Sequence, residues 1–253
     1  YYAYGLMNDT NLNFTTNLDN IKMDHDFRFG FKVHYDKINR DQYNANFTQA
    51  VGGGLTGLSS TSNADRNQVT KGYSAYFEDT IKLNKLTLLA GSRFEMIIQK
   101  YRNRNTVNKA EKQFAFVPGG GFIYDADNNF SYFGGIYKGF SFTGPYGSAD
   151  DGTPINPEKS LQKELGIRYS DANFGASLVG FHVDYENLIV LDNSNSGNSA
   201  DNAGEVISQG IEFSSTYSPE KILNLKGDAV FFFNATYTDA HLDSASLSTD
   251  SES

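Results

Sequence analysis

A short segment rich in positive charge stands out in an otherwise acidic sequence. The stretch QKYRNRNTVNKAEK holds a single acidic residue, Glu111, against five cations: Lys100, Arg102, Arg104, Lys109 and Lys112. Arginine presents a fork of donors that binds carboxylate oxygens in pairs, and an aromatic ring adds a stacking surface. We therefore predict an anion-binding loop made by Lys100, Tyr101, Arg102 and Arg104. A solvated loop without a ligand is the alternative interpretation.

Other groups that could do chemistry are scattered along the chain. The four histidines are far apart and lack the spacing of a metal-ligand pair: His25, His34, His182 and His241. Ser177, His182 and Asp184 alternate along one segment but match no lipase or protease motif. The glycine-rich stretch AVGGGLTGLSSTSNADRN lacks the lysine of a phosphate loop. We expect no bound metal, no cofactor and no enzymatic activity.

The composition excludes several classes of protein. Of the 253 residues, 39% are hydrophobic, which is enough for an ordered fold. The formal net charge of -9 argues against nucleic acid as a partner, because phosphate binding needs a basic surface. The absence of cysteine excludes a disulfide framework and a thiolate metal site. No apolar run reaches the roughly 18 residues of a transmembrane helix, but membrane-spanning strands remain compatible with the sequence.

Alternation of apolar and polar residues is the main structural signal. In AYFEDTIKLNKLTLLAGSRFE, residues 75–95, a two-residue turn would pair Leu83 with Leu86 and, further out, Tyr76 with Arg93. Each strand would then carry apolar residues on one face and polar residues on the other. The same alternation predicts further strands near residues 10–19, 27–35, 113–124, 130–140, 161–169, 174–190, 205–217 and 223–238. About ten antiparallel strands are expected in total.

The connections between these strands alternate in length. Short ones are expected at 83–86, 125–129, 170–173 and 218–223, and long polar ones at 37–68, 99–112, 141–159 and 191–204. Short turns on one side and long loops on the other are typical of an outer-membrane barrel. We predict an all-β, antiparallel up-and-down transmembrane β-barrel, with a soluble lipocalin-like barrel or β-sandwich as the alternative.

In such a barrel the polar positions of each strand face the lumen. We predict lumen-lining roles for Glu78, Arg93, Glu95, Glu164 and Arg168. Glu78 lies diagonal to Arg93 in the expected hairpin, so the two side chains are expected to form an ion pair.

Several segments carry more information than the alternation does. The stretches GGIYKGFSFTGP (134–145), INPEKSLQKELGIRYS (155–170) and NAGEVISQGIEFSSTYSP (202–219) resemble the late barrel strands of TonB-dependent outer-membrane receptors. KGYSAYFEDTIKLNKLTLLAGSRFE (71–95) and LVGFHVDYENLIVL (178–191) resemble that family's neighbouring strands. The resemblance implies a barrel of about 22 strands filled by a plug. We expect residues 1–253 to supply about ten middle-to-late strands of it, with the plug domain absent.

The resemblance also implies a location and a function. The protein is expected in the bacterial outer membrane, importing a scarce nutrient, most plausibly a ferric siderophore or another ferric chelate, with energy from the TonB complex acting through regions outside this chain. Lipopolysaccharide and outer-membrane lipid are expected partners, and lipopolysaccharide phosphates are an alternative ligand for the basic loop. A passive diffusion channel would conduct ions without an energy source. A surface adhesin would bind a partner without importing it.

Overall fold

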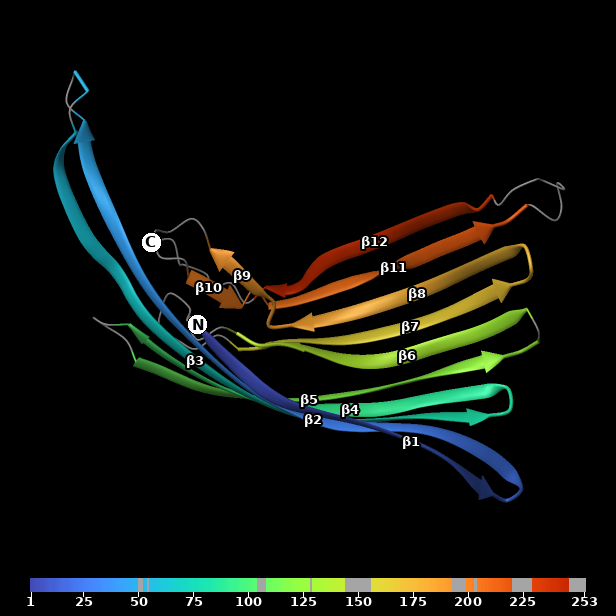
Figure 1. Ribbon diagram of the computed structural model, residues 1–253. Helices are drawn as coiled ribbons and strands as arrows, with labels where there is room; N and C mark the ends of the chain where they lie inside the picture. Colours follow the sequence, from blue (N-terminus) through green and yellow to red (C-terminus); the bar gives the residue numbers. More distant parts are fainter. Residues whose placement is uncertain are drawn as a thin grey trace.

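The protein is described by a computed structural model that covers residues 1–49, 52–53, 55–103, 108–127, 129–143, 156–192, 199–202, 204–219 and 229–245. These residues form one curved sheet of ten strands with a small two-stranded ribbon beside it (Figure 1). Within those ranges, no helix is long and apolar enough to cross a membrane.

The strands lie in the sheet in chain order apart from the ribbon. They are β1 (Tyr2–Leu18), β2 (Ile21–Gln49), β3 (Leu55–Leu83), β4 (Leu86–Asn103), β5 (Asn108–Asp125), β6 (Phe130–Ser141), β7 (Glu158–Ser170), β8 (Phe174–Glu186), β11 (Gly204–Tyr217) and β12 (Phe231–Ala245). The ribbon pairs β9 (Ile189–Asp192) with β10 (Ser199–Asn202), between β8 and β11 in the sequence. All neighbours are antiparallel, which confirms the predicted all-β, up-and-down architecture. β1 and β12 are the two edges, so the sheet does not close on itself.

The β3–β4 hairpin has the predicted register. Leu83 lies opposite Leu86, and Tyr76 lies opposite Arg93. Asn84 occupies the left-handed region with φ of 51°, a conformation that asparagine tolerates better than most residues. The turn residue therefore fixes which side chains share a face along the whole hairpin.

Two other short turns repeat one motif, Asp-x-Asn-Phe, that the sequence analysis did not notice. In the β5–β6 turn, the Asp127 carboxylate accepts hydrogen bonds from the backbone N–H groups of Asn129 and Phe130, each at 2.8 Å. In the β7–β8 turn, Asp171 accepts the same two bonds from Asn173 and Phe174, again at 2.8 Å. The carboxylate thus satisfies backbone donors that the strands leave unpaired at the turn.

The two faces of the sheet differ in chemistry. One face, which we call the apolar face, carries Phe77 on β3, Phe94 on β4 and Phe116 on β5, and the rings of Phe94 and Phe116 lie 4.8 Å apart. Large apolar side chains on this face remain exposed, such as Phe114 at 64% and Leu165 at 64%. Because a continuous exposed apolar surface is unfavourable in water, this face requires apolar surroundings. The opposite face, which carries Glu78 and Arg93, is called the polar face.

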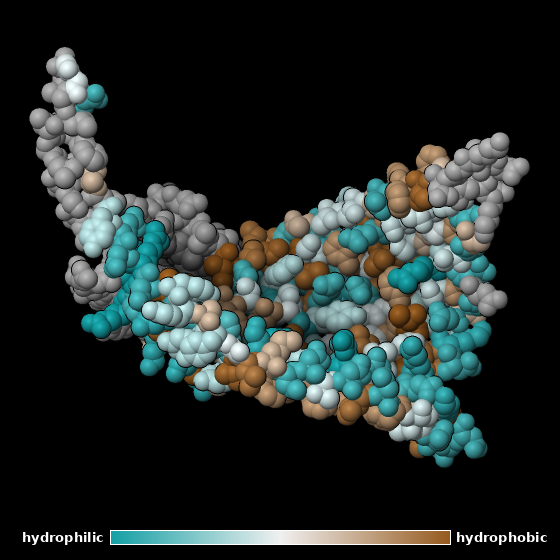
Figure 2. All heavy atoms as spheres, viewed as in Figure 1, coloured by the Kyte–Doolittle hydropathy of each residue, from teal (hydrophilic) through white to brown (hydrophobic). Residues whose placement is uncertain are grey.

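The strands also differ in length at the two ends of the sheet. The tight turns gather at one end, and at the other end β2 and β3 continue far beyond their neighbours as a two-stranded arm (Figure 1). Hydrophilic residues gather toward the two ends of the strands, with hydrophobic ones between them (Figure 2). This distribution fits an apolar band bounded by two aqueous sides.

The arm corrects one prediction. Residues 37–68 were expected to form a long polar loop, but β2 runs to Gln49 and β3 starts at Leu55, with pairing that continues to Gln49 opposite Leu55. The two strands satisfy each other's backbone groups beyond the sheet without needing an apolar face. Alternation is therefore missing from this segment, and a prediction based on alternation overlooks it. Likewise, the loop expected at 191–204 contains the end of β9 and all of β10, and most of the one at 141–159 lies outside the described residues.

Candidate functional site

The polar face brings together all five residues that were predicted to line a lumen. Glu78 lies on β3, Arg93 and Glu95 on β4, and Glu164 and Arg168 on β7, and the strand registers place them on one side of the sheet. The expected ion pair between Glu78 and Arg93 is wrong, because Arg93 binds Glu95 instead. Residues two positions apart share a face, so this pair forms within one strand.

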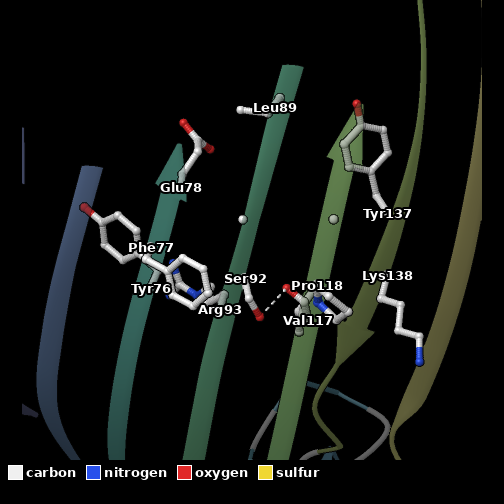
Figure 3. Close-up of a pocket in the computed structure, with 12 residues that line it drawn as sticks. Tyr76, Phe77, Glu78, Leu89, Ser92, Arg93, Val117, Pro118, Tyr137 and Lys138 are labelled. Atoms are coloured by element: carbon white, nitrogen blue, oxygen red, sulfur yellow. Dashed lines mark hydrogen bonds between the residues drawn. The ribbon is translucent and has the colours of Figure 1, made fainter. Parts of the chain in front are cut away.

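A hollow of about 310 Å³ lies on the polar face above β3 to β6. Its polar-face lining includes Tyr76, Glu78, Arg93, Gly119 and Tyr137. Glu78 stands to one side of β4 and Tyr137 to the other (Figure 3). The Arg93 guanidinium also reaches the Ser74 hydroxyl at 3.5 Å, so the hollow combines positive, negative and aromatic groups.

Aromatic rings on this face lie flat over glycines, so they project little from the sheet. A Cβ atom on Gly119 would meet the Tyr137 ring at 2.9 Å, and one on Gly121 would meet the Tyr137 hydroxyl at 3.0 Å. The same arrangement recurs where Tyr76 covers Gly30, Phe133 covers Gly166 and Phe181 covers Gly210. The rings therefore fill the space of missing side chains instead of projecting away from the wall.

A second hollow, of about 330 Å³, continues toward the short turns and shares Tyr137 with the first. It is lined in part by Phe133, Glu164 and Arg168. The Arg168 guanidinium lies 5.1 Å from the centre of the Phe133 ring, which is a cation–π contact. Phe133 thus orients Arg168, which was predicted to line the lumen. No role was predicted for Phe133.

Nearer the arm, the polar face holds its most buried side chains. Tyr101 is 7% exposed, Gln113 6% and Thr143 4%. The Gln113 amide donates to Glu111 at 2.6 Å and to the Thr143 hydroxyl, while its carbonyl oxygen is buried without a hydrogen-bond partner. Tyr101 is therefore buried and does not present an exposed stacking surface.

The predicted anion-binding loop is divided between the two faces. Lys100 and Arg102 are exposed on the apolar face, and Tyr101 lies between them on the polar face, because β4 continues as a strand through Asn103. Arg104 lies outside the described residues. The structure therefore does not bring Tyr101 together with the two cations beside it.

All four histidines lie next to an aspartate, which the sequence analysis did not foresee. The imidazole-to-carboxylate distances are 2.8 Å for His25 and Asp79, 2.5 Å for His34 and Asp36, 2.7 Å for His182 and Asp184, and 3.4 Å for His241 and Asp239. Three of these pairs are two positions apart, in the stretches HYD, HVD and DAH. Because residues two apart in a strand share a face, these three pairs could have been predicted from the sequence. Ser177 faces away from His182 and contacts Ser214 at 2.8 Å. Among the described residues, no group of three or more potential ligands gathers for a metal ion.

An up-and-down sheet with an exposed apolar face, a hollowed polar face, and turns and long connections at opposite ends defines the class of outer-membrane β-barrel proteins. Comparison with known proteins identifies the family. The chain matches the family described as "TonB dependent receptor-like, beta-barrel" over residues 1–252, and it belongs to this family of bacterial outer-membrane receptors.

Individual relatives share the fold at low sequence identity. The chain is 26% identical over 131 residues to the ferric-pyoverdine BN7/BN8 receptor of Pseudomonas putida, an alignment that covers 49% of this chain and 16% of that receptor. The unliganded ferric citrate transporter FecA matches with a TM-score of 0.72 and 18% identity, covering 94% of this chain and 35% of FecA. The ferric-catecholate import receptor Fiu of E. coli K12 matches with a TM-score of 0.62 and 17% identity, covering 96% and 38%. The chain thus spans little more than a third of these solved receptors.

Proposed function

We propose that this chain forms part of the barrel wall of a receptor that imports a ferric siderophore or a similar ferric chelate. Energy is supplied through the TonB complex, which acts on regions outside this chain. The polar face borders the import path, and the apolar face contacts outer-membrane lipid and lipopolysaccharide. No catalytic step is part of this function.

The observation that carries the proposal is the polar face itself. Its two hollows share Tyr137 and run along neighbouring strands. Their charged members on the polar face are Glu78, Arg93, Glu164 and Arg168, from β3, β4 and β7, and Lys138 of β6 also lines the first hollow. Aromatic rings and cationic side chains suit anionic chelates, which offer carboxylate and aromatic oxygens. The names of the P. putida receptor and of FecA, both tied to ferric chelates, agree with this ligand class.

The test is uptake of iron-55 chelates by cells that carry the complete receptor, with and without a proton uncoupler. We expect saturable uptake of at least one citrate, catecholate or pyoverdine-type chelate, abolished by the uncoupler. Exchanging Arg93 and Arg168 for glutamine should lower this uptake several-fold, whereas Lys163→Gln on the apolar face should leave it unchanged.

Other outcomes point to the alternatives. Conductance of the purified receptor in planar bilayers, together with uptake that is insensitive to the uncoupler, would support a passive channel and contradict the proposal. Binding of a protein or phage partner without uptake of any of the three chelate classes would support an adhesin.

A further inference from the structure

Five cations gather on the apolar face at the arm end of the apolar band. They are Lys37 on β2, Lys71 on β3, Lys100 and Arg102 on β4, and Lys112 on β5, and we call them the basic collar. On each of the four strands the first of these cations directly follows a large apolar or aromatic residue of this face, which is Tyr35, Tyr73, Ile98 or Phe114, although on β3 one more apolar residue, Val69, lies beyond Lys71.

The strand registers bring these cations close together. Lys37 and Lys100 both lie opposite Val69, and Lys71 and Lys112 both lie opposite Ile98. Each pair is therefore two strands apart, which is about 10 Å at the usual spacing of strands. Flexible lysine side chains extend far enough to meet a single group placed between them.

The collar carries no compensating negative charge within the described part of the chain. None of its five side chains forms an ion pair with a described carboxylate, and the first acidic residue beyond it on this face of β2 is Asp41, four positions past Lys37. The far half of the same face is built differently. There Lys163 binds Asp184 at 3.1 Å, and His182 lies 2.7 Å from the same carboxylate.

The height of the collar fits the boundary of the hydrocarbon layer. On β4 the apolar-face positions run from Leu86 to Ile98, with Ser92 as the exception, before Lys100 begins the charged part. Twelve residue steps at about 3.3 Å, in a strand tilted by about 40°, rise roughly 30 Å, close to the height of a barrel's apolar band. The collar therefore lies where lipid headgroups meet water, on the side of the long connections.

We propose that the basic collar binds the phosphate groups of lipopolysaccharide while its acyl chains pack on the aromatic residues below. Lysine and arginine are the residues that hold phosphate, and Phe94, Phe114 and Phe116 offer the adjoining apolar surface. A phosphorylated amphiphile satisfies both parts of this surface at once. The inference rests on the proposed contact of the apolar face with the membrane and is independent of the imported ligand.

This assignment changes the role of Lys100 and Arg102. Both were predicted to capture an anionic nutrient, and their position on the apolar face favours a lipid phosphate instead. Neutralising the collar should then weaken lipopolysaccharide binding without lowering nutrient uptake.

The experiment uses the complete receptor purified in a neutral detergent and titrated with fluorescent lipopolysaccharide. The test variant replaces Lys71, Lys100 and Lys112 with glutamine. The matched control replaces Lys138, Lys159 and Lys163 with glutamine, which removes the same charge from the far half of the apolar face. A third variant, with arginine at the three collar positions, keeps the charge and controls for folding.

We expect the glutamine collar variant to bind lipopolysaccharide at least about 10-fold more weakly, since each cation near an anionic surface contributes about fivefold. The control and arginine variants should bind as the unchanged receptor does, and dephosphorylated lipopolysaccharide should bind all of them weakly. Equal affinity of the glutamine collar variant and the unchanged receptor would overturn the proposal. Equal losses of affinity in the two glutamine variants would also overturn it. So would binding of phosphatidylglycerol vesicles or of inorganic phosphate to the unchanged receptor as tightly as lipopolysaccharide binds. Iron-55 uptake by the same variants separates this result from failure of the proposed import function.

Discussion

At the scale of single residues, the shape of the polar face depends on its glycines, which lack side chains and so leave space for neighbouring aromatic rings. Tyr137 lies along β5 and β6 over Gly119, Gly121 and Gly135, so a bulky ring occupies little of the space in front of the wall. The charged residues around it are thereby kept accessible. A barrel wall from which the aromatic side chains project little leaves more room for a large ligand.

Gly135→Ala is expected to destabilise the barrel, because the added Cβ would overlap the Tyr137 ring. Overpacking of this kind costs about 1–3 kcal/mol. Urea unfolding of the complete receptor in lipid vesicles measures the change. Gly72→Ala is the matched control, since its Cβ would lie 3.8 Å from its nearest neighbour, a side-chain atom of His34. Adding Tyr137→Ala should recover part of the loss, and an equal loss in the Gly72 control would contradict the explanation.

The turn aspartates make a prediction about pH. The backbone N–H of Asn173, the Tyr169 hydroxyl and the backbone N–H of Phe174 hold the pKa of the Asp171 carboxyl below its usual range. A lowered pKa stabilises the fold at pH values above the ordinary carboxyl pKa of about 3.9, and this contribution disappears as the pH falls through the folded pKa. Asp171→Ala should therefore lower the unfolding midpoint at pH 7 and have no effect under strongly acidic conditions. Asp171→Asn keeps an acceptor oxygen and should lose less at pH 7, and a pH-independent deficit in the alanine variant would argue against this explanation.

At the scale of elements, the arm formed by β2 and β3 is separable from the sheet below it. β1 pairs with β2 only as far as Lys37, and β4 pairs with β3 only as far as Arg66, so the arm makes its described ladder contacts within itself. Replacing residues 40–66 by an Asn-Gly turn would join Asn39 to Asn67, which already lie opposite each other. We expect the shortened receptor to fold with an unchanged unfolding midpoint, measured by the heat-induced shift in gel mobility. Failure to reach the outer membrane would show that the arm is needed for assembly.

The sequence predicted most strands below the arm, because their signal is the alternation itself. The bounds of the two edge strands were wrong, since β1 starts at Tyr2 and not near residue 10, and β12 extends to Ala245, beyond the expected end at 238. The pairing of Leu83 with Leu86 followed from one turn, and it placed Glu78, Arg93 and Glu95 on one face correctly. The arm was missed because its strands are largely polar and lack that alternation. The ribbon was missed because β9 and β10 are each only four residues long and β10 holds no large apolar residue. The partner of Arg93 was mistaken because a long side chain can reach either a diagonal neighbour or one two positions along its strand, and spacing alone does not decide between them.

The separation of the basic segment was missed for a related reason. The residues 99–112 were treated as a loop, in which neighbouring side chains can point the same way. In a strand they alternate, so Tyr101 lies on the polar face while Lys100 and Arg102 lie on the apolar face. The composition of the segment identified the cations. Only the strand register showed that Lys100 and Arg102 lie on the apolar face.

At the scale of the whole molecule, the two faces should meet different solvents. The chain contains no cysteine, so single cysteines introduced here can be labelled without competition from its own residues. In intact cells whose complete receptor lacks other cysteines, Glu95→Cys should react with a membrane-impermeant maleimide and Phe94→Cys should not. Equal labelling of these adjacent positions would contradict the assignment of the polar face to the lumen.

The turns, finally, have a consequence for the order in which the wall is built. The Lys85 carbonyl accepts a hydrogen bond from Asp125, the Asn129 carbonyl from Ser170, and the Asn173 carbonyl from Ser218, at 2.8, 2.9 and 2.8 Å. Each hairpin thus offers the next one a first point of attachment at the short-turn end. A hairpin that docked there first would have its register set before the rest of its ladder formed. The wall would then assemble by adding one hairpin at a time in chain order, and each completed turn would position the next hairpin.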